Sequence, residues 1–245
     1  PSEFAVDATY ARRFGDSFSL GTTLRYIYSN ITTGQFSTGQ GSRPGKSLAV
    51  DVSGYFKQPT YWLGHDAILS AGINISNIGT KMSYSDAAES YFLPTNLKIG
   101  GAATFILDED NELTAALDFN KLLVPTQPIY NTDGSIQSGK DPDRSVPAGI
   151  FGSFSDAPGG AGEELKEINI ASGLEYWYMK KFALRAGYFY ENPNKGDRRY
   201  FTMGTGVRYQ SMELNFSYLL ASSQNSPLAN TLRFSLLFNF GGSTK

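Results

Sequence analysis

Hydrophobic and polar residues alternate along the end of the chain, over residues 228–240. One set of alternate positions is leucine and phenylalanine throughout: Leu232, Phe234, Leu236, Phe238 and Phe240. The other set is mainly polar: Arg233, Ser235 and Asn239, with Leu237 as its apolar member. A period of two predicts a β-strand with one apolar face and one polar face.

The same alternation predicts eleven strands, at 4–14, 18–28, 47–57, 67–78, 95–107, 112–121, 167–179, 182–191, 200–210, 212–222 and 228–240. Most are about 10 to 13 residues long, near the length of a tilted bilayer span. Short turns at 15–17, 58–66, 108–111, 180–181 and 211 alternate with long loops at 29–46, 79–94, 122–166, 192–199 and 223–227. This alternation is typical of outer-membrane barrels. We therefore predict an all-β fold, a transmembrane antiparallel β-barrel.

The polar faces of these strands carry charges of both signs, which can pair inside a polar lumen. They are Asp7, Arg13, Arg25, Asp51, Lys57, Lys98, Asp118, Glu175, Arg185, Glu191, Arg208, Glu213 and Arg233. Single-chain bacterial barrels have an even number of strands, so an odd number is expected upstream, and three would give 14. The barrel is expected over 1–241, with a short tail at 242–245.

Composition argues against several classes of function. The chain has no cysteine, one histidine, and 21 basic against 23 acidic residues, so thiolate sites and a nucleic-acid partner are not expected. We predict no catalytic residue, cofactor or metal site.

The acidic run at 108–112 and the segments 131–134 and 141–143 are interpreted as turns. Gly204 and Gly206 are interpreted as small residues inside a strand that allow close approach. His65 is placed in a turn beside Trp62.

The longest predicted loop contains an apolar segment, 146–154, with Pro147 suited to the first position of a short helix. An apolar segment in an outer loop either packs on the barrel mouth or contacts a partner. Our candidate partner-binding residues are Val146, Ile150, Phe151 and Phe154. The acidic segment 163–167 is expected to be a solvated approach to the next strand.

Several runs of residues resemble the PorV family of outer-membrane proteins of the type IX secretion system. They are EFAVD (3–7), FLPTNLKIGG (92–101), FILDE (105–109), KLLVPT (121–126), GIFGSFSDAPGG (149–160), EELKE (163–167), LRAGYF (184–189) and NTLRFSLLFNFG (230–241). The resemblance covers nearly the whole chain. It implies a barrel of the FadL type with 14 strands, of which the last eleven are present here, in the bacterial outer membrane.

The resemblance also implies a function, that of a shuttle without enzymatic activity. Such a protein binds cargo proteins by their C-terminal signal domain at a giant outer-membrane translocon barrel. It then delivers them to the surface sortase and attachment complex, and it contacts outer-membrane lipid. An alternative is a FadL-like channel for hydrophobic small molecules. A third class is a barrel enzyme such as a lipid deacylase, which the single histidine makes a poor match.

Overall fold

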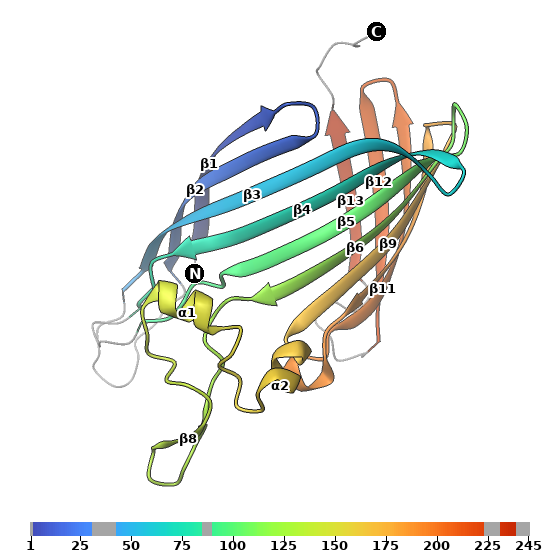
Figure 1. Ribbon diagram of the computed structural model, residues 1–245. Helices are drawn as coiled ribbons and strands as arrows, with labels where there is room; N and C mark the ends of the chain where they lie inside the picture. The colour runs from blue at the N-terminus through green and yellow to red at the C-terminus, as the bar shows by residue number, and fades with distance from the viewer. Residues whose placement is uncertain (1, 31–42, 85–89, 223–230, 239–245) are drawn as a thin grey trace. The chain divides into compact units, whose positions relative to one another are not determined.

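A computed structural model describes residues 2–30, 43–84, 90–222 and 231–238 (Figure 1). Its long strands are β1 Ser2–Phe14, β2 Phe18–Asn30, β3 Gly45–Trp62, β4 His65–Gly79, β5 Asn96–Ile106, β6 Glu112–Leu122, β9 Ile168–Tyr178, β10 Phe182–Tyr190, β11 Arg199–Tyr209, β12 Met212–Ala221 and β13 Thr231–Phe238. The shorter elements are β7 Ile129–Tyr130, β8 Ile136–Ser138, α1 Val146–Gly152, α2 Ala161–Lys166 and a 3₁₀ turn at Pro193–Lys195.

The long strands form one sheet in the order β1-β2-β3-β4-β5-β6-β9-β10-β11-β12-β13, with antiparallel pairing between neighbours. The all-β prediction is confirmed. Among the described residues, the order begins at β1 and ends at β13. Parts of the expected last strand (228–230 and 239–240) and the tail at 242–245 lie outside the described residues.

The chain divides into two compact units. The first contains residues 1–56, 72–99 and 120–168, and therefore β1, β2 and both short helices. The second contains residues 57–71, 100–119 and 169–245, and therefore the hairpins of β10 to β13. In the described residues, no helix is long and apolar enough to cross a membrane.

In strands such as β2 and β12 the apolar face is the more exposed one, whereas both faces of β1 are exposed. In β2, Leu24 is 56% exposed, whereas the neighbouring Arg25 side chain is only 22% exposed. In β12 and β13, the directly paired Leu214 and Leu236 are each 52% exposed. Soluble proteins seldom expose contiguous apolar surface of this kind. The arrangement of polarity is therefore the reverse of that in a soluble sandwich.

Charged side chains pair on the opposite face in the first unit. Asp7 and Arg25 are cross-strand partners, and Arg25 Nε lies 2.8 Å from Asp7 Oδ1. Arg25 Nη2 also lies 3.2 Å from Asp51 Oδ2, and Nη1 donates to the Asn77 side chain at 2.5 Å. Opposite charges placed directly across a strand pair stabilise it. For these residues, the predicted pairing of charges is confirmed.

The second unit contains a similar network. Arg185 Nε lies 2.5 Å from Glu175 Oε2, and Arg208 Nη2 lies 2.8 Å from Glu213 Oε2, each pair being in register across adjacent strands. Gly206 makes room for this network, because a Cβ there would lie 2.8 Å from Arg185 Nη1. The interpretation of this glycine as a site of close approach is confirmed.

One predicted turn was wrong. The segment 58–66 was expected to be a medium turn, but β3 continues to Trp62 and β4 begins at His65. Only Leu63 and Gly64 turn, both with positive φ (52° and 85°), as a tight two-residue hairpin requires. His65 is therefore the first residue of a strand, and Trp62 stacks on Phe105 with 5.6 Å between ring centroids.

Candidate functional site

The connection between β6 and β9 holds most of the irregular structure, including α1 and α2 (Figure 1). The helix expected in the apolar segment is present as α1, with proline in its first turn, and this prediction is confirmed. It ends at Gly152, and Ser153 donates its backbone N–H to Gly149 O. Phe154 therefore follows the helix, outside its regular structure.

One face of α1 packs on the protein through Gly149. A Cβ at this position would lie 2.6 Å from the Phe92 ring and 3.3 Å from Pro125 Cδ, so only glycine allows this approach. The exposed side of the segment carries Phe151, which is 78% exposed, and Phe154, which is 50% exposed. The segment thus both packs on its own unit and presents aromatic side chains outward.

The four candidate partner-binding residues are divided by this packing. Val146 and Ile150 are half-buried, whereas Phe151 and Phe154 are exposed. Leu165 on α2, which the sequence analysis did not select, is 70% exposed. Whether any of these residues binds a partner stays a prediction.

A buried lysine joins the end of β6 to α2. Lys121 Nζ lies 2.9 Å from Glu164 Oε2 and 2.7 Å from Glu167 Oε2, and its side chain is only 7% exposed. It also lies 5.9 Å from the centroid of the Phe154 ring. The expectation of a solvated segment at 163–167 is wrong for these two glutamates, because α2 turns them inward onto Lys121.

Glu164 also holds the link between the two helices. Its Oε1 accepts the backbone N–H groups of Asp156 (2.7 Å) and Ala157 (2.8 Å). Asp156 is fully buried, with Oδ2 3.5 Å from Arg144 Nη2. Burial raises the pKa of Asp156 and the nearby Glu164 carboxylate adds to the rise, whereas Thr126 and Arg144 oppose it. The ionic cluster formed by Lys121, Arg144, Asp156, Glu164 and Glu167 fixes α1 and α2 to β6.

The raised pKa of Asp156 predicts a pH-dependent contribution to the stability of this connection. Above the ordinary carboxyl pKa of 3.8, the folded state binds a proton more readily than the unfolded state. Stability from this group therefore falls as pH rises toward the raised pKa, by at most about 1.4 kcal/mol per pH unit. The measurement is hydrogen exchange at the Ser153 amide, corrected for intrinsic exchange, from about pH 4 to 7. The Asp156→Asn variant should lack this component, and an identical pH profile in both proteins would contradict the prediction.

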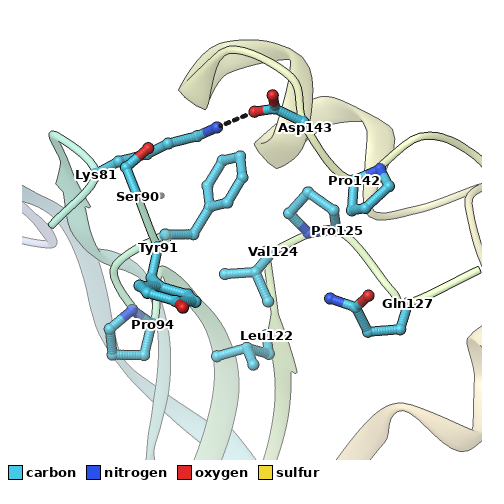
Figure 2. Close-up of a pocket in the computed structure, with 11 residues that line it drawn as sticks. Lys81, Ser90, Tyr91, Pro94, Leu122, Val124, Pro125, Gln127, Pro142 and Asp143 are labelled. Atoms are coloured by element: carbon cyan, nitrogen blue, oxygen red, sulfur yellow. Dashed lines mark hydrogen bonds and ion pairs between the residues drawn. The ribbon is translucent and has the colours of Figure 1, made fainter. Parts of the chain in front are cut away.

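A pocket of about 680 Å³ lies in the first unit, between the β4–β5 and β6–β9 connections (Figure 2). Its lining residues are Lys81, Ser90, Tyr91, Phe92, Pro94, Leu122, Val124, Pro125, Gln127, Pro142 and Asp143. Lys81 Nζ pairs with Asp143 Oδ1 at 3.0 Å and lies 4.5 Å from the centroid of the Phe92 ring. The sequence analysis selected none of these residues as candidate site residues, because they come from parts of the chain that are distant in sequence.

The acidic segments form turns, as predicted. The pKa of Asp108 is lowered, mainly by a hydrogen bond from the Asn111 side chain. Asp108 Oδ1 also accepts the backbone N–H groups of Asp110 and Asn111, which lowers the pKa further. Asp133 Oδ1 accepts from the Ser135 N–H, and Asp141 Oδ1 accepts from the Asp143 N–H. Across the described ranges, no three metal-ligating side chains come together.

Comparison with protein families gives one match. A family model described as type IX secretion system protein PorV matches residues 1–129, just over half of the 245 residues. A comparison with curated proteins found no match. The matched segment contains β1 to β6 and the pocket residues from Lys81 to Gln127, and it ends before α1. The resemblance seen in the sequence motifs is thus confirmed, and the chain belongs to the PorV family of type IX secretion system proteins.

Proposed function

We propose that this chain is part of an outer-membrane β-barrel that acts as a shuttle in the type IX secretion system. It binds the C-terminal signal domain of cargo proteins at the translocon barrel and delivers them to the sortase and attachment complex at the cell surface. The family match supports a role in this secretion system. The shuttle role itself, its partners and the closed FadL-like barrel are our proposals.

The exposed apolar face of the sheet is the observation that carries the membrane location. A lipid-facing strand surface is apolar, and the opposite face of such a barrel is polar. Leu24 and Arg25 follow this rule in β2, as Leu214 and Glu213 do in β12. Charges on the polar face are paired by the networks of Arg25 and Arg185. This pattern supports strands that cross the outer membrane.

The loop cluster around α1 is the proposed contact for protein partners. Connections between strands are the parts of a barrel that leave the bilayer, and functional contacts concentrate on loops held by a rigid scaffold. Among the residues that the structure describes, Phe151 is the most exposed large hydrophobic residue, at 78%. The ionic cluster holds this segment in place through Glu164 and Lys121, so Phe151 is presented on an ordered surface.

Replacing Phe151 by serine is expected to reduce recovery of the partner protein at least tenfold, because burying a phenylalanine contributes about 1.5–3 kcal/mol. The measurement is purification of the full-length protein from outer membranes in mild detergent, followed by mass spectrometry. The wild type should bring down a very large barrel or proteins that share one C-terminal domain. Leu63→Ser, at another exposed position (72%) in the β3–β4 turn, is the matched control.

A channel for hydrophobic small molecules is the second candidate, favoured by the apolar wall that Phe92, Leu122 and Val124 give the pocket. If the full-length protein is recovered alone with a bound apolar small molecule, the channel replaces the shuttle as the proposed function. Recovery of the same partner proteins with wild type and Phe151→Ser would remove Phe151 from the binding site.

A further inference from the structure

We propose that the pocket between the β4–β5 and β6–β9 connections is a docking site for an uncharged peptide segment of a partner protein. The segment inserts one large apolar side chain between Tyr91 and Leu122, and its backbone amide bonds to the Gln127 side chain. This inference rests on the proposed function, because it supposes that the loops contact a protein. It adds a second contact point, separate from Phe151.

The walls of the pocket suit an apolar side chain. Leu122 and Val124 point to the same side of the chain, whereas Leu123 between them is 1% exposed and faces away. Across the pocket, Tyr91 is 59% exposed, and Leu122 is 45% exposed (Figure 2). Two large apolar side chains thus stand open to solvent in a concave site, where an inserted side chain would remove both from water.

Three prolines restrict the backbone around the pocket. Pro94, Pro125 and Pro142 contribute to its lining, and proline fixes its own backbone φ and has no backbone N–H to leave unpaired. Gly149 of α1 packs behind the wall, against Phe92 and Pro125. A preformed site does not spend binding free energy on ordering its own walls.

The polar groups of the pocket favour a peptide over a lipid. The Gln127 side chain, exposed and facing the pocket in Figure 2, has no hydrogen-bond partner among the residues that the structure describes. A primary amide both donates and accepts, which matches the carbonyl and N–H of a peptide group. An acyl chain would cover this amide without offering a hydrogen bond, which costs free energy.

The charges at the pocket favour an uncharged ligand. Lys81 and Asp143 are the charged lining residues, and they pair with each other at 3.0 Å. A carboxylate or phosphate on the ligand would have to share Lys81 with Asp143 and would be repelled by its negative charge, and an ammonium group would be repelled by Lys81. The pocket therefore offers no net charge to an ionic head group, whereas a neutral peptide leaves the pair intact.

Peptide titration of the full-length protein in lipid nanodiscs tests the chemistry of the site. The probes are acetyl-Gly-Leu-Gly-amide, its serine analogue and decanoate, and the readout is the methyl NMR signals of Leu122 and Val124. We expect saturable shifts with the leucine peptide and at least about tenfold weaker binding of the serine peptide. Gln127→Leu should weaken binding of the leucine peptide several-fold, whereas Gln137→Leu on β8, outside the pocket, should not change it.

Two results of the titration would overturn the proposal. One is the absence of saturable shifts with the leucine peptide. The other is decanoate binding more tightly than the peptide with no effect of Gln127→Leu, which would make the pocket a lipid site.

Partner recovery from cells separates this inference from the proposed function. Val124→Trp fills the pocket with a larger apolar side chain and leaves Phe151 in place, and we expect it to lower recovery of the partner at least fivefold. If Phe151→Ser abolishes recovery while Val124→Trp leaves it unchanged, the shuttle proposal stands and the pocket proposal is wrong. If the wild type recovers no partner protein, the shuttle proposal fails, while the titration still decides what the pocket binds.

Discussion

Replacing Lys121 by methionine is expected to release the connection between α1 and α2. It should lower the free energy of unfolding by about 3–5 kcal/mol, the usual effect of removing one partner from a buried ion pair. The Lys121 side chain is 7% exposed, and those of Glu164 and Glu167 are 10% and 13% exposed. Without the ammonium group, two carboxylates remain close together in a site that excludes water. Methionine preserves most of the apolar part of the lysine side chain. The loss of stability therefore results mainly from removing the positive charge.

Hydrogen exchange at the backbone amides of Asp156 and Ala157 measures this effect. Both amides donate to Glu164, so their protection should fall at least a hundredfold when Glu164 loses its partner and turns to solvent. Lys140→Met is the matched control, because Lys140 Nζ donates to the Ser155 hydroxyl at an exposed position. Its effect should stay within about 0.5 kcal/mol. Equal effects of the two substitutions would show that the Lys121 cluster does not hold the connection.

Local sequence pattern was sufficient to predict the long strands, although not the short β7 and β8. Each strand repeats its polarity every two residues, and this period survives in any packing that separates the two faces of a sheet. The hydrophobic faces did not reveal which side is buried, since a soluble sandwich and a membrane barrel share the pattern. The structure shows which face of β2 is the more exposed, because Leu24 is exposed while Arg25 beside it is half-buried.

The β3–β4 hairpin shows why its boundary was misread. Pro59 has no backbone N–H to donate to a strand ladder, a property that disfavours the middle of a strand. The pairing of β3 with β2 ends at Phe56, and Pro59 lies beyond it, where β2 requires no donor. The strand therefore continues past the proline to Trp62. A breaker residue ends a strand only where its missing N–H is needed.

The ionic cluster could not be predicted from local sequence. The sequence predicts a solvated segment at 163–167, because charged residues are usually exposed. Glu164 is instead buried and Leu165 is 70% exposed. The reason is Lys121, which lies 43 residues earlier and meets Glu164 only in the folded chain. The pocket was missed for the same reason, because Tyr91 lies in the β4–β5 connection and Leu122 lies at the end of β6.

Replacing Leu24 by arginine is expected to destabilise the protein in its membrane by about 2–4 kcal/mol, the cost of a cation at the lipid-facing midplane of a barrel. Leu24 lies near the middle of β2 and is 56% exposed. In water, an arginine at so exposed a position would change stability within about 0.5 kcal/mol. The size of the effect therefore reports which solvent surrounds this face.

The neighbouring substitution Thr23→Arg provides the control, because it introduces the same side chain on the opposite face of the same strand. Thr23 is the cross-strand partner of Asp51, so an arginine there meets a carboxylate rather than lipid. Equilibrium unfolding of the full-length protein in urea, from lipid vesicles, gives both free energies. We expect Leu24→Arg to be less stable than Thr23→Arg by at least about 2 kcal/mol. The opposite order would mean that the charged face meets the lipid, and it would contradict the membrane location that the exposed leucines support.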